Sequence, residues 1–409
     1  MIKAPDYALL VDVPMYPSTP VEWTKALVAF DTTSRFSNLE LIHYIADYLR
    51  HYGIHSELSF NEEHTKANLW ATLPDSQGRL TGGLVLSGHT DVVPVDGQAW
   101  SNDPFTPEIR EGKLYGRGTC DMKGFIATVL SLIPQFISTP LREPIHLAFS
   151  YDEEVGCLGA GSMLADMQAR GLNPSGCIVG EPTSMRPVVA HKSINTYRCV
   201  VHGCAAHSSL TPKGTNAIEY AARFICMFRD LTDRIKTSGP FDELFDVPYT
   251  TGQTSTIRGG TAVNIVPAEC EFELEFRTLP TQSPEEIYRQ LQSYINDVLV
   301  PQMQLENPQA SMQLIRMAAS PGMDTAEQEA ITQLVRGLTG DASQRKVAYA
   351  TEGGPFQQAG VPTVICGPGS IEQAHRADEY IELEQLAQCE RFLMAVLRAQ
   401  AQVQQQPQS

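Results

Sequence analysis

The first half of the chain alternates between helical and extended hydrophobic patterns. Apolar residues recur at helical spacing after Asn38, which predicts an amphipathic helix. Short apolar runs at 54–60, 68–72 and 84–87 predict strands. Asp121 stands where the N-cap of a further helix is expected, just before another apolar stretch. Helices that alternate with strands favour an α/β fold with a largely parallel sheet and helices on its faces.

The pattern changes near residue 188. Residues 269–276 alternate strictly between glutamate and apolar side chains, which predicts an antiparallel strand with one solvated face. Long amphipathic stretches at 216–236 and 284–299 predict two helices over this sheet. From about residue 313 the alternation of helices and strands resumes. The sequence therefore predicts an α+β domain inserted into the first domain.

This organisation gives a catalytic domain in two parts, residues 1–187 and 309–409, around an inserted domain at 188–308. A length of 409 residues agrees with two domains, because single cores rarely grow so large. The glutamine-rich tail, residues 400–409, is expected to be disordered.

Composition narrows the class of protein. The chain is 42% hydrophobic and has a formal net charge of −17, which argues against general binding to nucleic acids or anionic membranes. The N-terminus lacks a signal-peptide pattern, and no run of membrane-spanning length is expected. Nine scattered cysteines without a C-x-x-C pair fit neither a disulfide framework nor a structural zinc module. A reducing cytosol is the simplest expectation.

Four apolar, strand-like runs each stop at side chains that can bind a metal ion. In chain order these side chains are His89, Glu153 with Glu154, Glu181 and His375. Asp121, at the predicted helix start, is a fifth position of this kind. Strands of an open α/β sheet deliver functional groups at their carboxyl ends, so these residues can converge on one crevice. Two histidines and several carboxylates suit a divalent metal site that keeps vacant positions for water and substrate.

Seven motifs in order resemble the dinuclear zinc amidohydrolases of the M20 metallopeptidase family. They are Ser87–Pro94, Leu114–Gly124, Asp152–Gly156, Gly180–Pro182, Gly203–Ser209, Gly260–Pro267 and Ala374–Glu379. The resemblance extends from about residue 20 to residue 395. It implies a zinc-exopeptidase-like catalytic domain with an inserted lid and dimerisation domain.

The resemblance implies two divalent ions, with Zn²⁺ expected and Co²⁺ as the alternative. Asp121 would bridge them, because a carboxylate has one oxygen for each ion. His89 and Glu181 would complete the protein ligands of one ion, and Glu154 and His375 those of the other. Each ion then keeps open positions, as catalysis requires.

Two acidic residues beside these ligands have implied catalytic roles. Asp91 is the expected partner of the free imidazole N–H of His89. Glu153 would accept a proton from water and pass it to the leaving amine. For Asp121 taken alone, a simple helix N-cap is the more common role of an aspartate at a helix start, and both roles are compatible.

The inserted domain carries a further candidate, His207. Its position before two serines fits an ordinary surface histidine. The resemblance instead implies that His207 stabilises the tetrahedral oxyanion in the partner subunit's site, so a homodimer through the inserted domain is expected.

Substrate contacts are predicted from the charge of an acylated amino acid. Its α-carboxylate requires a cation or polar group, for which Arg277 and Asn264 are candidates by the family pattern. A solvent-facing Arg277, or one paired with a neighbouring glutamate, is the alternative. Glu352 would meet a cationic side chain of the substrate. Gly353 stands where the most similar family members more often have alanine, a departure that concerns side-chain preference and not the chemistry.

Within the family, Cys120–Gly124 and Ala350–Ile381 are most similar to acetylornithine deacetylases. The implied reaction is hydrolysis of N2-acetyl-L-ornithine to acetate and L-ornithine, in arginine biosynthesis. Alternatives are a succinyl-diaminopimelate desuccinylase and a deacetylase of another N-acyl amino acid such as acetylcitrulline. A non-catalytic metal-binding protein is a third hypothesis, but it predicts loss of the general base, and Glu153 is present.

Overall fold

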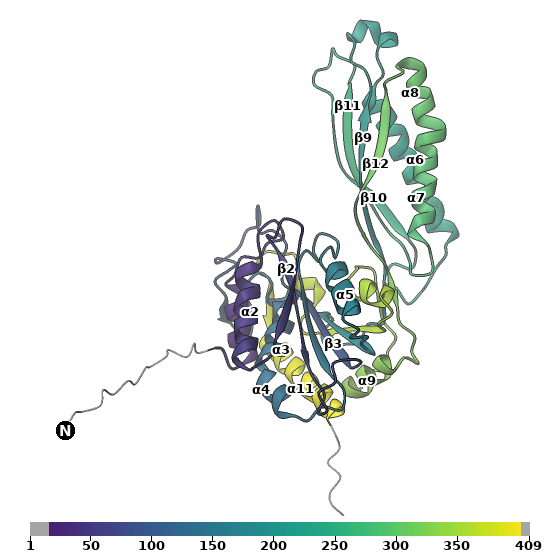
Figure 1. The fold of residues 1–409 in the computed structure, drawn as a ribbon. Helices are drawn as coiled ribbons and strands as arrows, with labels where there is room; N and C mark the ends of the chain where they lie inside the picture. Colours follow the sequence, from purple (N-terminus) through teal and green to yellow (C-terminus); the bar gives the residue numbers. More distant parts are fainter. Residues whose placement is uncertain (1–15, 402–409) are drawn as a thin grey trace, which may run out of the picture.

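The computed structural model describes residues 16–401. A broad domain is built around one sheet, and an elongated domain stands on it (Figure 1). The chain enters the elongated domain after the first part of the broad domain and then returns. The predicted α/β catalytic domain with an α+β insertion is confirmed.

The broad domain has a six-stranded sheet of order β1-β2-β6-β3-β7-β15. Its strands are β1 (Ser56–Phe60), β2 (Ala67–Leu73), β3 (Leu84–His89), β6 (Ile145–Ser150), β7 (Gly176–Pro182) and β15 (Thr363–Gly367). β6, β3, β7 and β15 run parallel, whereas β2 and β1 pair antiparallel at one edge. The four parallel strands therefore present their carboxyl ends along the same edge of the sheet.

Helices cover both faces of this sheet. One face packs against α1 (Pro20–Val28), α2 (Leu39–His51), α3 (Gly124–Ser131), α4 (Ile133–Ser138), α9 (Ala330–Thr339) and α11 (Leu383–Gln400). The other packs against α5 (Ala160–Ala169) and α10 (Gly353–Gln358). Successive strand residues point to opposite faces, so Leu86 joins the first core and Val85 the second.

The inserted domain is an antiparallel sheet covered on one face by helices. Its strands, in the order β10-β11-β9-β12, are β10 (Thr251–Gly259), β11 (Glu269–Arg277), β9 (Ile194–His202) and β12 (Ser311–Ser320). The helices are α6 (Ala217–Ser238), α7 (Pro284–Ser293) and α8 (Val300–Glu306). Along β11 the apolar residues are buried and the glutamates lie on the other face, as the alternation predicted.

The predicted end of the inserted domain at residue 308 is too early. β12 pairs with β9 from Ser311 to Ser320, so the last strand of the inserted sheet lies beyond that boundary. The apolar alternation of this segment shows a strand but does not show which sheet the strand joins. At the other end, β8 (Ala190–His191) belongs to a small sheet with β13 (Met323–Asp324) and β14 (Lys346–Val347) at the junction of the domains.

Another small sheet pairs β4 (Glu108–Arg110), β5 (Lys113–Tyr115) and β16 (Tyr380–Glu382). The predicted tail needs one revision, because Gln400 is the last residue of α11 and is buried. The tail from 402 to 409 lies outside the described residues.

One segment is long and apolar enough to span a membrane by composition, contrary to the expectation from sequence. Thr119–Ser138 has a mean hydropathy of 1.3, but 83% of its apolar window is buried inside the protein. It contains α3 and α4, which pack in the core beneath the sheet. Its apolar character is therefore explained by burial within the domain.

Candidate active site

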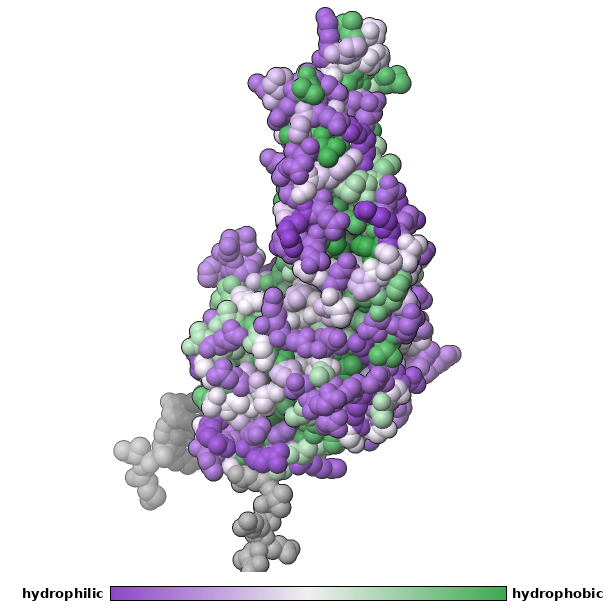
Figure 2. Space-filling model, turned by 90° about the vertical axis from the view of Figure 1, so that its right-hand side faces the viewer, coloured by the Kyte–Doolittle hydropathy of each residue, from purple (hydrophilic) through white to green (hydrophobic). Residues whose placement is uncertain are grey.

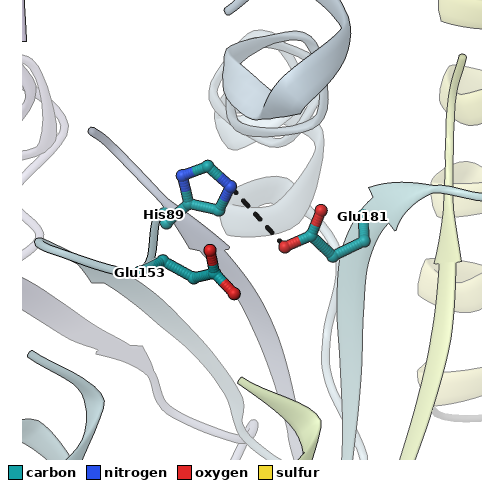
Figure 3. A group of neighbouring side chains, drawn as sticks. All are labelled: His89, Glu153 and Glu181. Atoms are coloured by element: carbon teal, nitrogen blue, oxygen red, sulfur yellow. Dashed lines mark ion pairs between the residues drawn. The ribbon is translucent and has the colours of Figure 1, made fainter. Parts of the chain in front are cut away.

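The predicted metal ligands come together at the carboxyl edge of the parallel strands. His89 is the last residue of β3, and Glu181 lies near the end of β7. Glu153 and Glu154 follow β6, and His375 follows β15. Figure 3 shows the imidazole of His89 and the carboxylates of Glu153 and Glu181 turned toward one another.

Asp121 lies between the two histidines. Its Oδ1 is 3.0 Å from His89 Nε2, and its Oδ2 is 3.3 Å from His375 Nε2. Each carboxylate oxygen therefore faces a different imidazole. The prediction that Asp121 also caps a helix is wrong, because α3 begins only at Gly124 and the backbone of Asp121 is not helical.

Each histidine has a glutamate as a second neighbour. Glu181 Oε1 lies 3.5 Å from His89 Nε2, and Glu154 Oε2 lies 3.0 Å from His375 Nε2. The ligand atoms of His89, Glu153 and Glu181 all lie within 4.8 Å of one another, as do those of His89, Asp121 and Glu154. The structure thus brings together all five residues that the sequence analysis named as metal ligands.

The ionisable groups of this cluster shift one another's pKa values. Burial and the nearby charge of Asp121 raise the pKa of Glu154 to about 7, and they raise the pKa of Glu181 well above its usual range. Burial alone would raise the pKa of Asp121, but hydrogen bonds from His375 and His89 hold it well below its usual value. The hydrogen bonds that His375 makes with Asp121 and Glu154 raise the pKa of His375 to about 10. Four carboxyl groups, those of Asp121, Glu153, Glu154 and Glu181, thus lie around only two imidazoles.

The donor set fits divalent cations. Glu154 Oε1 is buried and has no hydrogen-bond partner among the residues from 16 to 401. Oxygen and imidazole nitrogen donors are the ligands of zinc and similar ions in catalytic sites. A cation between these carboxylates would relieve their repulsion and satisfy the unpaired oxygen.

Asp91 is near His89 but its carboxylate has other partners. The Nδ1–H of His89 donates to the main-chain oxygen of Asp91 at 2.9 Å, while the Asp91 carboxylate lies 3.7 Å away. That carboxylate accepts the main-chain N–H groups of Glu153 and Glu154 at 3.0 and 3.3 Å. The predicted contact between Asp91 and His89 therefore exists, but through the main chain of Asp91. The Asp91 side chain instead holds the turn that carries Glu153 and Glu154.

A pocket of about 280 Å³ opens beside this cluster. Arg277 lines it from the end of β11, and its guanidinium also pairs with Glu275 at 2.8 Å. Both predicted alternatives for Arg277, a pocket contact and a glutamate pair, are thus present together. Tyr349 and Cys157 also line the pocket, and no sequence pattern had indicated either of them.

Glu352 is placed differently from the prediction. Its side chain is fully buried and lines no part of this pocket. Its carboxylate accepts hydrogen bonds from the hydroxyl of Ser87 at 2.9 Å and from that of Ser150. The prediction that Glu352 contacts a substrate side chain is therefore wrong for this conformation. Both of its carboxylate oxygens accept hydrogen bonds beneath the edge of the sheet and do not face the pocket.

His207 and Asn264 lie at the far end of the inserted domain. Ile194, at the start of β9, lines the pocket, and His202 ends the same strand. The eight residue-to-residue steps from Ile194 to His202 span about 26 Å. His207 and Asn264 come from neighbouring loops beyond that end, where Ser208 N–H donates to the main-chain oxygen of Asn264 at 3.0 Å. Both residues are exposed and remote from the metal ligands of their own chain.

Sequence comparison agrees with this geometry. The model of peptidase family M20/M25/M40 matches residues 85–399. The chain belongs to this family. It is 37% identical to an acetylornithine deacetylase of Proteus mirabilis over 361 residues, which are 88% of this chain and 89% of that protein. It is 36% identical to an acetylornithine deacetylase of Shigella sonnei, with 88% of this chain and 92% of that protein covered.

Solved structures show the same M20 fold. A metallo-carboxypeptidase from Sulfolobus solfataricus superposes with a TM-score of 0.72 at 17% identity, covering 93% of this chain and 98% of that one. A dinuclear metal-binding peptidase from Bacillus subtilis has a TM-score of 0.62 at 14% identity, covering 92% and 96%. The family resemblance inferred from the motifs is therefore confirmed, and the protein is a metal-dependent hydrolase.

Proposed function

We propose that the protein hydrolyses the amide bond of N2-acetyl-L-ornithine to acetate and L-ornithine, a reaction of arginine biosynthesis. The observation that carries the proposal is the position of Asp121, whose two carboxylate oxygens face His89 and His375 beside Glu153. The substrate is inferred from the curated relatives, which are acetylornithine deacetylases at 36–37% identity.

Two divalent ions, with Zn²⁺ expected and Co²⁺ as the alternative, would be held by the five ligands. Asp121 would be shared, with His89 and Glu181 on one side and Glu154 and His375 on the other. Such ions, when bound, lower the pKa of water and polarise a carbonyl group. The pairing of each histidine with one glutamate and one oxygen of Asp121 supports this division of the ligands.

Glu153 would act as the general base. Its carboxyl group lines the pocket within 4.8 Å of the ligand atoms of His89 and Glu181. Burial raises the pKa of its carboxyl group above the usual range, which is the direction in which enzymes tune a glutamate that must both take up and release a proton. It can take a proton from the attacking water and deliver it to the leaving nitrogen, a role typically worth about 10²–10⁴ in rate.

Arg277 would bind the α-carboxylate of the substrate. Among the described residues that line the pocket, Arg277 is the only arginine or lysine. Glu275 holds the guanidinium in place through two hydrogen bonds at 2.8 and 3.4 Å. The remaining N–H groups of the fork are available for a carboxylate, which an arginine binds with defined geometry.

The site would be completed by the inserted domain of a second subunit. His207 Nδ1 accepts the main-chain N–H of Ser209 at 3.2 Å, so in the neutral ring the proton is on Nε2. That N–H is suited to stabilise an oxyanion. The distance along β9 supports delivery to a partner's site, because His207 is remote from the metal ligands of its own chain.

The surface of the inserted domain supports a homodimer. β10 is an edge strand and most of its residues are exposed. Hydrophobic side chains are exposed there and in the neighbouring loops, namely Leu210, Ile257, Val263 and Ile265. Figure 2 shows hydrophobic residues at the surface of the elongated domain among mostly hydrophilic ones. Pairing with a second copy would cover both the strand edge and these side chains.

Steady-state rates on a small panel of substrates test the proposal. The panel contains N-acetylornithine, N-acetylcitrulline and N-succinyl-diaminopimelate. We expect kcat/KM for N-acetylornithine to exceed that for each of the others by at least about tenfold. A higher kcat/KM for another compound would assign the protein to that substrate and reject the proposed one.

A further inference from the structure

Three side chains connect the loop that carries Asp121 with the loop that carries His375. They are Gln98, Arg117 and Glu379. None of them lines the pocket, and where their side chains contact Asp121 and His375 they do so at main-chain atoms, not at the atoms that would bind a metal ion. Arg117 and Glu379 are each only 1% exposed, although both are charged. A buried ion pair costs desolvation free energy, so its presence beside a reaction centre requires an explanation.

Glu379 holds the main chain of the Asp121 loop. Its Oε1 accepts the N–H groups of Gly118, Cys120 and Asp121 at 3.1, 2.9 and 3.1 Å. These three groups belong to a loop that is not regular helix, and their hydrogen bonds would otherwise be unmade in a buried region. The carboxylate of Glu379 therefore determines where the backbone of Asp121 lies.

Arg117 connects Glu379 to the loop around His375. One guanidinium nitrogen, Nη1, donates to Glu379 Oε2 at 2.7 Å and to the main-chain oxygen of Arg376 at 3.3 Å. The other, Nη2, donates to Gln98 Oε1 at 2.6 Å. The planar fork of an arginine can make these contacts at once, whereas the single ammonium of a lysine lacks that geometry.

Gln98 completes the connection at the main chain of His375. Its Nε2 donates to the main-chain oxygen of His375 at 3.0 Å. The indole N–H of Trp100 donates to Gln98 Oε1 at 3.0 Å and so holds the amide in this orientation. His375 has a φ of 61°, a left-handed conformation that costs free energy for a residue with a side chain. Such a conformation persists where neighbouring contacts hold it.

We propose that Gln98, Arg117 and Glu379 form a buried clamp that fixes Asp121 and His375 relative to each other, so that both can bind the same metal ion. These are positioning residues, and they act through the main chain of the two ligand-bearing loops. The inference rests on the proposed metal centre. His89 and Glu181 lie on strands outside the clamp, so the ion on the His375 side depends on it through two ligands, whereas the other ion depends on it only through Asp121.

Metal binding to the metal-free protein tests the clamp. The variants are Gln98→Ala, Arg117→Lys and Glu379→Gln, and titration calorimetry with Co²⁺ gives the dissociation constants of the two ions. His375→Ala identifies the binding step that belongs to the His375 side. We expect the three clamp variants to weaken that step by about 10- to 100-fold, with a smaller change in the other step. The visible spectrum of the cobalt-loaded protein should also differ from that of the wild type in the variants that weaken this binding step.

A matched control is Glu327→Gln, which removes one charge of the ion pair between Glu327 and Arg336. The carboxylate of Glu327 accepts hydrogen bonds from Arg336 at 2.7 and 2.8 Å. This pair lies in a part of the domain that carries none of the five ligands. The control variant should leave both dissociation constants unchanged. Thermal unfolding of each metal-free variant separates weaker binding from a loss of folding. If Arg117→Lys or Glu379→Gln does not fold, Gln98→Ala decides, because Gln98 is partly exposed.

Two results would overturn the clamp. One is a set of folded variants with the dissociation constants of the wild type, and the other is weaker binding only in the step that His375→Ala leaves intact. Hydrolysis of N-acetylornithine by the wild-type protein is measured separately. Its absence would reject the proposed substrate, while the metal titrations would still decide on the clamp.

Discussion

The carboxylate of Asp91 accepts the main-chain N–H of Glu153 at 3.0 Å. It also accepts the N–H of Glu154 at 3.3 Å and the hydroxyl of Ser34 at 2.7 Å. Asp91 lies two residues after His89, so it joins the end of β3 to the turn after β6. One side chain thus sets the distance between a candidate metal ligand and the candidate base.

Replacement of this carboxylate should disturb Glu153 more than it disturbs metal binding. In Asp91→Asn the amide NH₂ must face one of the two backbone N–H groups, so one of those hydrogen bonds is lost. We expect kcat to fall by about 10- to 100-fold with metal content close to that of the wild type. Ser34→Ala, which leaves both backbone hydrogen bonds intact, is the control and should change kcat much less. Loss of the metal in Asp91→Asn would show that the side chain serves mainly to position the metal ligands His89 and Glu154.

Metal removal should abolish activity. The five ligands lie around one pocket, and their carboxylates repel one another without a cation. We expect up to two equivalents of zinc or cobalt per chain after gentle purification, and activity should return when either metal is added back to chelated protein. A metal-free preparation with full activity would contradict the assignment of the site.

The adjacent glutamates should separate in their effects. Glu153→Gln keeps the shape of the side chain but removes the base, so turnover should fall by about 10²–10⁴ with normal metal content. Glu154→Gln should lower the occupancy of one metal ion, because Glu154 lies 3.0 Å from His375. Metal analysis together with kcat distinguishes the two. Metal loss in Glu153→Gln would reverse the two roles.

The sequence predicted this site well because its geometry follows from the fold class. β3, β6, β7 and β15 were expected to run parallel, and parallel strands bring their carboxyl ends to one edge. The positions of His89 and Glu181 follow directly from that rule. Asp121 was predicted from its place at an expected helix start and not from a strand end, and the family motifs added its role as the ligand shared by both ions.

Other positions depended on contacts between distant segments, which residue spacing does not encode. Asp121 was expected to cap a helix, but the distant Glu379 holds its backbone in a non-helical loop. The spacing of Asp91 from His89 suggested a side-chain contact, whereas the bend after β3 presents the carbonyl instead. The depth of Glu352 beneath the sheet edge, and the sheet to which β12 belongs, are likewise properties of the assembled fold.

Stability at low pH should depend on His191. This residue is fully buried in β8, its Nε2 has no partner within residues 16–401, and burial lowers its pKa to about 4 from an ordinary value of 6.5. A lowered folded-state pKa means that the unfolded chain takes up the proton first. The stability contributed by neutral His191 is therefore complete above pH 6.5 and is lost as the pH falls toward 4.

By linkage, the loss between pH 8 and pH 5 is about 2 kcal/mol. His191→Asn keeps a donor for the main-chain oxygen of Lys192, which His191 Nδ1 contacts at 2.8 Å, but it does not titrate. Urea unfolding of the metal-free proteins at both pH values should show a smaller pH dependence in the variant by about this amount. Equal pH dependence in both proteins would mean that the pKa of His191 is the same in the folded and unfolded states, contrary to this prediction.

The final prediction concerns His207. If the inserted domain brings this histidine to the partner subunit's site, then His207→Ala and Glu153→Gln damage different components of one composite site. Each variant alone should be nearly inactive. In a mixed dimer, one of the two sites would contain an intact His207 from one chain and an intact Glu153 from the other. Mixing the two variants under conditions that allow subunit exchange should therefore restore part of the wild-type activity, up to about a quarter if the chains combine at random.

The experiment needs a measure of exchange and a control for it. Differently tagged chains report the fraction of mixed dimers, and a mixture of Glu153→Gln with Glu154→Gln gives the control, because both changes lie in the same half of the site and no intact site can form. Recovery in the first mixture but not in the control would support delivery of His207 in trans. Demonstrated exchange without recovery would place His207 in the site of its own chain, which requires the inserted domain to swing down over the roughly 26 Å length of β9, or in no site.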